Sequence, residues 1–423
     1  MEKLIIKGKK QLRGEVTIAG AKNAALGILP ACILSDGICK IENLPNIKDV
    51  NNYIHILHYL GAEITVTSER CIEINSKKIK CQEITSDAHE NIRKMRASYY
   101  LIGALLGKCK EVEIPLPGGC DIGTRPIDQH LKGFKALGAD VNIENGKVKA
   151  KAKELTGATI FLDVVSVGAT INIILAAVKA KGITTIENAA KEPHVVDVAN
   201  FLNLMGAQIK GAGTEVIRIT GVDVLGSCDY MVIPDQIVAG TYMLAAAVTK
   251  GDILVKNIIP KHMESITAKL IEMGINIEEY DDAVRVIGVS EPKPANIKTA
   301  PYPGFPTDLQ QPMAVLMCLA KGVSTINENV FESRFKYLDE LRKMGVEVSV
   351  NGRTSLIIGN GKLSGCPLKA TDLRAGAAMV LAGLAAEGIT EITGLNHIDR
   401  GYENMECNLC SLGADITRVT IDE

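Results

Sequence analysis

The sequence predicts an α/β protein of two domains, each with helices inside and sheets outside. One phrase, a short helical run that ends in Gly and continues into an alternating strand, recurs about every 70 residues, which is longer than an ordinary solenoid repeat. A chain of 423 residues is also too long for one ordinary hydrophobic core, so two domains of three units each are expected. The six phrases are centred on Gly61, Gly138, Gly206, Gly274, Gly345 and Gly413.

Each unit is expected to open with an apolar helix of small residues, such as INIILAAVKAKG at 171–182. A helix that is apolar nearly all round is buried inside its domain. A strand follows, for example at 184–188 or 390–394, and then a loop and a second, amphipathic helix. The Gly that ends this helix supplies the positive φ of a C-terminal cap. The alternation that comes next, as at 62–66, is typical of a half-buried strand.

The boundary between the domains is predicted between the third and fourth units, near 221–234. The N-terminal domain would then cover 22–229, and the C-terminal domain would cover 1–21 together with 230–423. An alternating strand at 3–7 precedes the first unit and must pair elsewhere. If it crosses to complete the C-terminal domain, two connections join the domains and form a hinge.

Charge and hydropathy exclude several classes of protein. The formal net charge is −2 and the pI is about 6.4, which argues against a nucleic-acid binder and against a polybasic membrane surface. The N-terminal residues lack an apolar signal core, and the apolar stretches are too short for a bilayer span. The sequence therefore predicts a soluble, cytoplasmic protein.

The cysteines and histidines give no sign of a metal centre. Eleven Cys without a paired spacing indicate free thiols in a reducing compartment. The seven His are scattered, so no zinc site is expected, and no other metal or organic cofactor is implied. Four cysteines in apolar contexts are expected to be inert packing residues: Cys32, Cys109, Cys318 and Cys410.

Charged residues gather at two equivalent places in the units, just before the buried helix and just after the strand. Helix starts already favour anions, and Lys and Arg side chains add to that preference. Any one such residue can be an ordinary helix end, but the set predicts a site for a small, multiply charged anion between two domains that close on it. Its basic members are Lys22, Lys48, Arg96, Arg125, Arg334, Arg374 and Arg400. Asp235, Asp308 and Asp372 occupy the helix-start place in the last three units.

One loop, LPGGCDIGTRP at 116–126, is longer and richer in Gly than its counterparts. It carries a thiol at Cys120, five residues before Arg125. Fixed cations near a mobile loop can lower the pKa of a thiol and bring it over a bound substrate. Cys120 is therefore predicted to be functional.

Seven motifs carry a family resemblance: GAKNAAL at 20–26, MRAS at 95–98, LPGGCDIGTRPID at 116–128, SVGAT at 166–170, FPTD at 305–308, TDLRA at 371–375 and HIDRGYE at 397–403. In this order the chain resembles the enolpyruvyl transferase family, and within it the UDP-N-acetylglucosamine 1-carboxyvinyltransferases. The resemblance implies a two-domain inside-out α/β barrel. It also implies transfer of the enolpyruvyl group of phosphoenolpyruvate to the sugar 3-hydroxyl, with release of phosphate, in the first committed step of peptidoglycan synthesis.

The same resemblance implies a role for each matching residue. The catalytic groups would be Cys120 as acid and Asp308 as base, with Lys22 and Arg400. Phosphoenolpyruvate would be bound by Lys22, Asn23, Arg96, Cys120, Arg125 and Arg400. The nucleotide sugar would lie against Asn23, Arg96, Arg125, Pro126, Ile127, Asp128, Ser166, Val167, Gly168, Asp308 and Val330. Closure of the site would be supported by Lys48, Arg334, Asp372 and Arg374. The implied partners are the two substrates, with no nucleic acid, membrane or obligate protein partner.

The chain departs from the family pattern at four positions and leaves other functions open. Gln236 and Val238 stand where an Arg and a Glu are common, and Val164 and His194 also differ. The nearest rival is the shikimate-pathway enolpyruvyl transferase, against which the loop of Cys120 argues. An RNA 3′-phosphate cyclase is a more distant rival by fold. A paralogue that binds the UDP-sugar with weakened catalysis is an alternative from another class.

Overall fold

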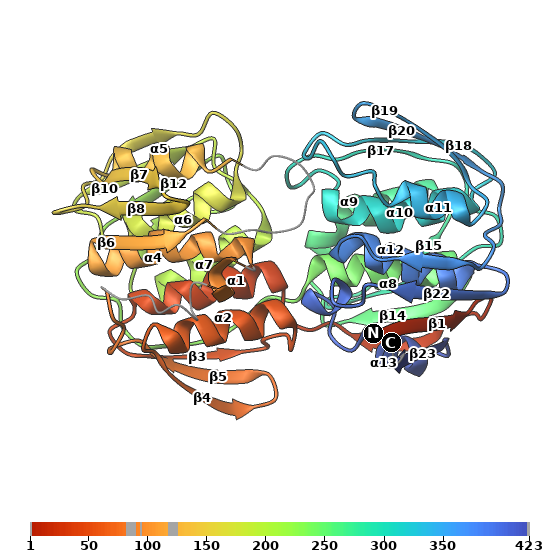
Figure 1. The fold of residues 1–423 in the computed structure, drawn as a ribbon, viewed down its shortest axis with the longest axis horizontal. Coiled ribbons are helices and arrows are strands. Elements are labelled where there is room, and N and C mark those ends of the chain that lie inside the picture. Colours follow the sequence, from red (N-terminus) through yellow and green to blue (C-terminus); the bar gives the residue numbers. More distant parts are fainter. Residues whose placement is uncertain (1, 82–89, 94, 117–125, 421–423) are drawn as a thin grey trace. The chain divides into compact units, whose positions relative to one another are not determined.

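The computed structural model describes residues 2–81, 90–93, 95–116 and 126–420 (Figure 1). Contacts between Cα atoms divide them into two compact units. The N-terminal unit contains the described residues between 20 and 233, and the C-terminal unit contains residues 2–19 and 234–420. Each unit combines helices with sheets in which most strand pairs are antiparallel. The predicted α/β class is therefore confirmed.

The described strands of the N-terminal unit form three sheets that enclose one apolar core. In spatial order, the strands of the first sheet are β13 (Cys228–Met231), β3 (Ile38–Glu42), β5 (Cys71–Asn75) and β4 (Glu63–Ser68). Those of the second sheet are β6 (Glu111–Pro115), β8 (Lys147–Lys151) and β7 (Asp140–Glu144). Those of the third sheet are β11 (Gln208–Lys210), β12 (Val216–Thr220), β10 (Ile183–Glu187) and β9 (Thr159–Phe161). Three helices are buried almost throughout: α1 (Lys22–Ala31), α4 (Tyr100–Cys109) and α6 (Val167–Ala177). Three others keep one exposed face: α2 (Lys48–Tyr59), α5 (Asp128–Ala136) and α7 (Pro193–Leu204).

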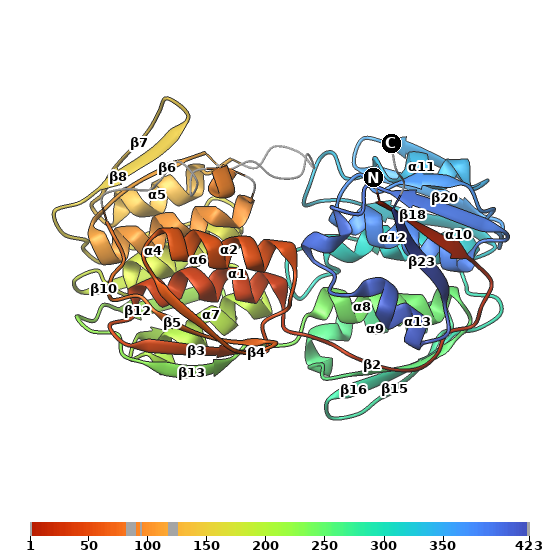
Figure 2. The same cartoon turned by 60° about the horizontal axis from the view of Figure 1, so that its bottom comes forward.

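The C-terminal unit is built in the same manner around a second core (Figure 2). In spatial order, its first sheet contains β15 (Asn276–Glu279), β16 (Ala283–Ile287), β14 (Asp252–Lys256) and β2 (Arg13–Thr17). Its second sheet contains β17 (Asn296–Lys298), β18 (Gly322–Asn327), β20 (Thr354–Gly359) and β19 (Glu347–Asn351). Its third sheet contains β21 (Pro367–Lys369), β22 (Ile389–Thr393), β1 (Glu2–Lys7) and β23 (Asp415–Thr420). The buried helices are α8 (Gln236–Val248), α10 (Gln310–Leu319) and α12 (Leu373–Ala385). The outer helices are α9 (Glu264–Glu272), α11 (Leu338–Lys343) and α13 (Met405–Ser411).

The N-terminal residues lie in the sheets of the C-terminal unit. The strand expected at 3–7 is present as β1, which pairs antiparallel with β22 on one side and β23 on the other. Ile5 lies opposite Glu391 of β22 and Thr417 of β23. β2 pairs in parallel with β14 of the same unit.

The six glycines of the recurring phrase all adopt positive φ, as the sequence predicts. Their φ angles range from 87° at Gly274 to 107° at Gly206. In each case a helix ends just before the Gly and a strand begins two residues after it; α2 ends at Tyr59 and β4 begins at Glu63, for example. An L side chain is strained in this conformation, which explains why Gly stands at these turns.

Another glycine sets how closely two buried helices approach. A Cβ atom on Gly103 of α4 would lie 2.2 Å from the carbonyl oxygen of Asn172 in α6, and Gly103 N–H donates to Asn172 Oδ1 at 2.8 Å. Gly103→Ala must push the helices apart, so it is expected to lower the free energy of unfolding by about 3 kcal/mol, at the upper end for overpacking. Gly226→Ala is the control, because the nearest atom to its Cβ would be 3.8 Å away. Urea unfolding of both variants measures the difference, and equal stabilities would contradict the prediction.

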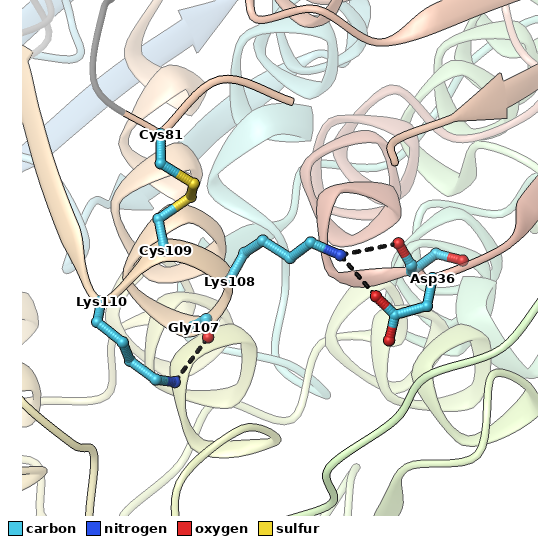
Figure 3. Close-up of a disulfide and its surroundings, with 7 residues drawn as sticks. Asp36, Cys81, Gly107, Lys108, Cys109 and Lys110 are labelled. Atoms are coloured by element: carbon cyan, nitrogen blue, oxygen red, sulfur yellow. Dashed lines mark hydrogen bonds and ion pairs between the residues drawn. A yellow bond between two sulfur atoms is a disulfide. The ribbon is translucent and has the colours of Figure 1, made fainter. Parts of the chain in front are cut away.

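The cysteines are not all free thiols, so that expectation is wrong. Cys81 and Cys109 form a disulfide across 28 residues of sequence, with their Cα atoms 5.5 Å apart (Figure 3). The fold brings Cys81, which follows β5, to the last residue of α4, and the spacing along the chain gave no sign of this. Cys32 and Cys318 are buried as expected, whereas Cys410 is exposed and donates to the carbonyl of Ile416.

Asp197 of α7 gives the N-terminal unit a dependence on pH. It is 2% exposed, and burial raises its pKa to about 6, although Tyr230 Oη and the Ile233 N–H donate to its carboxylate. The pKa of this carboxyl is near 4 in the unfolded chain and about 6 in the folded protein. Between these two values the folded state binds more protons than the unfolded state, so the free energy of unfolding falls as pH rises. Asp197→Asn should abolish that fall. In urea unfolding, the free energy of unfolding of the wild type is expected to fall by about 3 kcal/mol relative to that of Asp197→Asn between pH 4 and pH 8. A difference that stays constant over this range would contradict the prediction.

Candidate functional site

In the N-terminal unit, α1 and α2 begin beside each other and are joined by an ion pair. Lys22, the first residue of α1, is buried, and its Nζ lies 2.7 Å from Asp49 Oδ2 in the first turn of α2. Their side chains are only 11% and 4% exposed. Asn23 and Lys48, at the starts of the same two helices, are exposed. Two helix starts and two ammonium groups make this region suited to an anion.

Arg96 lies at the start of a third helical segment of this unit. It opens a 3-10 turn (Arg96–Tyr99) that runs directly into α4, and Ser98 closes this turn by donating to the carbonyls of Ile92 and Met95. The Arg96 guanidinium carbon lies 5.2 Å from the centre of the Tyr99 ring. Burial lowers the pKa of Arg96. A half-buried guanidinium next to a helix start is a suitable ligand for a carboxylate or phosphate.

The structure brings together two segments that the resemblance assigns to the nucleotide sugar. Asp128 begins α5, and Gln129 donates both to Asp128 and to Asp163, three residues before Ser166. Ser166 caps α6 by accepting from the N–H of Ala169 at 3.2 Å. A Cβ on Gly168 would lie 3.0 Å from His130 Nε2, so Gly168 lets that ring approach. Pro126 is exposed, Ile127 is buried and Val167 is half-buried.

Sequence reasoning did not single out Gln129 and His130, although both directly follow the motif that ends at Asp128. Asn172 Nδ2 lies 2.8 Å from His130 Nδ1 and also donates to the carbonyl of Tyr99. Burial lowers the pKa of His130 to about 3, with a further contribution from Arg96. The imidazole is therefore neutral, with Nδ1 accepting from the amide.

Two of the predicted site residues, Cys120 and Arg125, lie outside the described residues. Their roles rest on the sequence.

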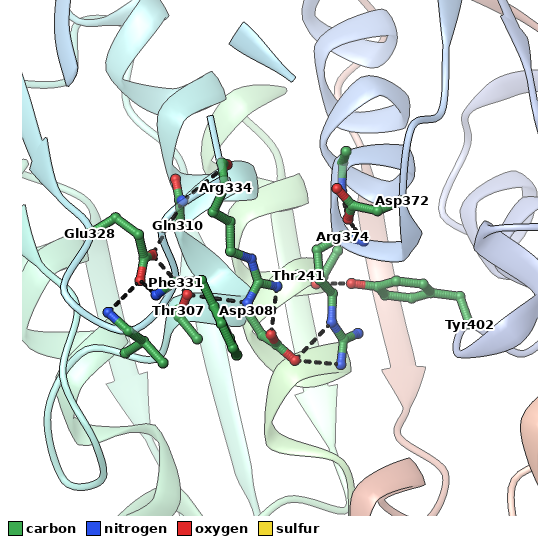
Figure 4. Close-up of polar contacts among 12 residues, drawn as sticks. Thr241, Thr307, Asp308, Gln310, Glu328, Phe331, Arg334, Asp372, Arg374 and Tyr402 are labelled. Atoms are coloured by element: carbon green, nitrogen blue, oxygen red, sulfur yellow. Dashed lines mark hydrogen bonds and ion pairs between the residues drawn. The ribbon is translucent and has the colours of Figure 1, made fainter. Parts of the chain in front are cut away.

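In the C-terminal unit, Asp308 is held between two arginines (Figure 4). It lies in a 3-10 turn (Thr307–Leu309) that leads into α10. Arg334 Nη2 donates to its Oδ1 at 2.7 Å, and Arg374 Nε and Nη2 lie 3.1 Å from its Oδ2. Both arginine side chains are 4% exposed, whereas that of Asp308 is 26% exposed. The carboxylate is thus the part of this cluster that solvent or a ligand can reach.

The surroundings of Asp308 act on its pKa in opposite directions. Burial alone would raise the pKa, but the charges and hydrogen bonds of Arg374 and Arg334 outweigh burial and hold the pKa well below its usual range. Asp308 is therefore a carboxylate at neutral pH.

Arg374 is fixed on its other side by aromatic and capping groups. Its guanidinium carbon lies 5.4 Å from the centre of the Tyr402 ring, and Tyr402 Oη lies 2.9 Å from Thr241 Oγ1 of α8. Asp372 caps α12 by accepting from the N–H groups of Arg374 and Ala375 at 2.9 and 3.0 Å. Asp235 caps α8 in the same way. Asp372 thus sets the start of the helix that carries Arg374.

Arg400 ends a 3-10 turn (Ile398–Arg400) that is anchored to the last strand of the unit. Arg418 of β23 binds both oxygens of Asp399, at 2.8 and 3.3 Å, and also Glu406 at 2.7 Å. This anchors the residue next to Arg400, which is itself half-buried. Val330 is half-buried in the segment after β18.

Gln236 and Val238, two of the departures from the family pattern, open α8. Among the described residues, Gln236 Oε1 is buried without a hydrogen-bond partner. An Arg at position 236, which is common in the family, would place a longer, charged side chain in this buried environment. Val164 is exposed.

The described part of the chain offers neither a metal-binding cluster nor a membrane-spanning helix. It contains no group of three or more His, Cys, Asp or Glu side chains arranged to hold a metal ion. None of its helices has the length and hydropathy needed to cross a membrane.

Comparison with known proteins identifies the family. The family model described as EPSP synthase (3-phosphoshikimate 1-carboxyvinyltransferase) matches residues 6–409. The chain belongs to the EPSP synthase family.

Within the EPSP synthase family, the chain is similar to proteins of one activity. It is 59% identical to UDP-N-acetylglucosamine 1-carboxyvinyltransferase 3 of Caldanaerobacter subterraneus subsp. tengcongensis, over 99% of this chain and 100% of the relative. It is 60% identical to UDP-N-acetylglucosamine 1-carboxyvinyltransferase of Clostridium botulinum, over the same shares.

Solved structures of enolpyruvyl transferases share the fold. The enolpyruvyl transferase NikO from Streptomyces tendae matches with a TM-score of 0.88 and 25% identity, over 100% of this chain and 99% of that one. EPSP synthase from Acinetobacter baumannii matches with a TM-score of 0.73 and 18% identity, over 99% and 100%.

Proposed function

We propose that this protein transfers the enolpyruvyl group of phosphoenolpyruvate to the 3-hydroxyl of UDP-N-acetylglucosamine, with release of phosphate, in the synthesis of peptidoglycan. The observation that carries this proposal is the similarity at 59–60% identity, over nearly the whole chain, to proteins named for that activity. The basic helix starts of the N-terminal unit are suited to anionic substrates, and the arginine-bound Asp308 is a carboxylate that can accept a hydroxyl proton.

The reaction would proceed by addition and then elimination. A proton is added to the methylene carbon of phosphoenolpyruvate, and the sugar oxygen bonds to the adjacent carbon and loses its own proton. The tetrahedral intermediate then loses a proton from the new methyl group and expels phosphate. The phosphate and carboxylate charges need fixed cations throughout, for which Lys22, Arg96, Arg125 and Arg400 are proposed. Cys120 is proposed as the acid.

Asp308 is proposed to accept the proton of the sugar hydroxyl. With its pKa held low by Arg334 and Arg374 it is a weak base. A weak base suffices because the sugar oxygen becomes strongly acidic only when it bonds to the electron-poor carbon. Each carboxylate oxygen has two lone pairs, so a hydroxyl can still donate while the arginines stay in place.

The finer architecture is part of the same proposal. The buried helices within three sheets of each unit support an inside-out barrel built from six repeated βαβαββ-type units, three in each domain. We propose the domains as 22–229, and 1–21 with 230–423. The remaining sugar contacts are proposed at Asn23, Asp128, Ser166, Gly168 and Val330, with Pro126, Ile127 and Val167 beside them. Lys48 and Asp372 would support closure.

Phosphate release from phosphoenolpyruvate tests the function, with UDP-N-acetylglucosamine and shikimate 3-phosphate offered separately as acceptors. Release only with the UDP-sugar is expected. Cys120→Ala should abolish turnover, while Cys407→Ala, which removes an exposed free thiol, should leave it unchanged. Phosphate release with shikimate 3-phosphate instead would identify shikimate 3-phosphate as the acceptor. UDP-sugar binding without turnover would indicate a paralogue of weakened catalysis and direct attention to Gln236 and Val238.

A further inference from the structure

Glu328, close to Asp308, is a buried carboxylate that no part of the mechanism uses. It directly follows β18 and is fully buried (Figure 4). Its Oε1 accepts from the N–H groups of Val330 and Phe331 at 2.8 and 3.0 Å. Its Oε2 accepts from Thr307 Oγ1 at 2.7 Å and from Gln310 Nε2 at 3.3 Å. Four donors converge on one carboxylate, which only accepts.

Three of these four partners also contact Arg334. Thr307 gives its hydroxyl proton to Glu328 and accepts from Arg334 Nη1 at 3.2 Å. The guanidinium carbon of Arg334 lies over the Phe331 ring, 5.1 Å from the ring centre. Gln310 Nε2 lies 3.4 Å from the Arg334 carbonyl. Glu328 thereby fixes a hydrogen-bond acceptor, a ring face and a backbone contact around one arginine.

We propose that Glu328 is a positioning residue for Asp308: it arranges the groups that hold Arg334, and Arg334 in turn orients the Asp308 carboxylate. The inference rests on the proposed function of Asp308 as a base. The connection between Glu328 and the Asp308 carboxylate runs through Thr307 and Arg334, over hydrogen bonds of 2.7, 3.2 and 2.7 Å.

A second consequence concerns the nucleotide sugar. The two N–H groups that Glu328 accepts from belong to Val330 and Phe331, and Val330 is a proposed sugar contact. One side chain therefore ties the segment that would touch the acceptor to the turn that carries the base. Loss of Glu328 should disturb both, whereas loss of Thr307 should disturb only the base.

The test is Glu328→Gln, which keeps the shape but places an NH2 group against N–H or O–H donors. Displacement of a catalytic group by about 1 Å costs up to ~100-fold, so kcat for UDP-sugar-dependent phosphate release is expected to fall by 10- to 100-fold. Asp308 is faced by Arg334 and Arg374, with Asp235 acting on Arg374. Weaker contact with Arg334 should raise the pKa of Asp308, so the acidic limb of the kcat–pH profile should move to higher pH.

Glu340→Gln is the matched control in the same unit. Glu340 is also buried, accepts from the N–H of Lys369 at 3.0 Å and pairs with Lys343; its hydrogen bonds and ion pairs within the described part of the chain do not include Arg334 or Asp308. It should lower stability without changing kcat or the pH profile. If Glu328→Gln does not fold, Thr307→Val removes the bridging hydroxyl alone and should lower kcat about tenfold with the same shift of the acidic limb.

The outcomes separate this inference from the proposed function. An active wild-type protein whose Glu328→Gln or Thr307→Val variant keeps kcat within twofold and an unmoved acidic limb overturns the positioning role alone. Equal effects of Glu340→Gln and Glu328→Gln also overturn it, because the effect would then be general destabilisation. A wild-type protein without phosphate release overturns the proposed function, and this inference with it.

Discussion

Asp308→Asn is expected to lower kcat for phosphate release by about 10²- to 10⁴-fold, the usual contribution of a positioned general base. The amide cannot accept the sugar proton, and its NH2 group would face a guanidinium. Binding of UDP-N-acetylglucosamine should weaken far less, since the proposed sugar contacts in the N-terminal unit remain. Steady-state kinetics with titration calorimetry measures the two effects separately.

The same substitution should also lower stability. Arg334 and Arg374 would remain 4% exposed without a carboxylate partner, and breaking a buried ion pair costs about 3–5 kcal/mol. Asp339→Asn is the control, because Asp339 pairs with Arg342 on the surface of α11, where an ion pair contributes less than about 1 kcal/mol. Equal stabilities of the two variants, or a kcat for Asp308→Asn within twofold of wild type, would show that the arginine pair serves another purpose.

Lys22→Met is expected to lower kcat/KM for phosphoenolpyruvate by about 10²- to 10³-fold, as loss of one charge-stabilising donor does elsewhere. Its ammonium is proposed to bind the charged donor, and a methionine fills the same volume without the charge. Since the Lys22–Asp49 pair is buried, the free energy of unfolding should also fall by about 3–5 kcal/mol.

Lys151→Met provides the comparison for Lys22→Met. Lys151 pairs with Glu111 across β8 and β6, and its side chain is 70% exposed. Its loss should leave kcat/KM unchanged and alter stability by less than about 1 kcal/mol. Assays at a temperature where both variants are fully folded separate catalysis from stability. Unchanged kcat/KM in Lys22→Met would show that Lys22 does not bind phosphoenolpyruvate.

The local features of the fold could be predicted from the sequence, because short-range patterns determine them. Positive φ at the phrase glycines, the strand at 3–7 and the helix that begins at Lys22 all follow from neighbouring residues. Long-range partners could not be predicted in this way. Cys81 and Cys109 approach each other only because the fold brings the segment after β5 to the end of α4, so the spacing along the chain gave no indication of it.

The candidate site shows the same division. Asp308 and Arg334 were identified from their places before a helix and after a strand, but their mutual hydrogen bond depends on tertiary packing. Glu328 carries no signal in the sequence, where it is an ordinary glutamate at the end of a strand. Two of its four donors, the N–H groups of Val330 and Phe331, directly follow it in the chain, whereas Thr307 and Gln310 are brought to it only by the fold.

The place of β1 between β22 and β23 has a consequence for synthesis on the ribosome. The first strand to emerge cannot find either neighbour until nearly the whole chain has been translated, which takes about 20–80 s at ordinary elongation rates. The N-terminal unit has no such dependence and can fold while translation continues. During that delay, residues 2–7 expose two unpaired strand edges, which makes this nascent segment a natural substrate for chaperones.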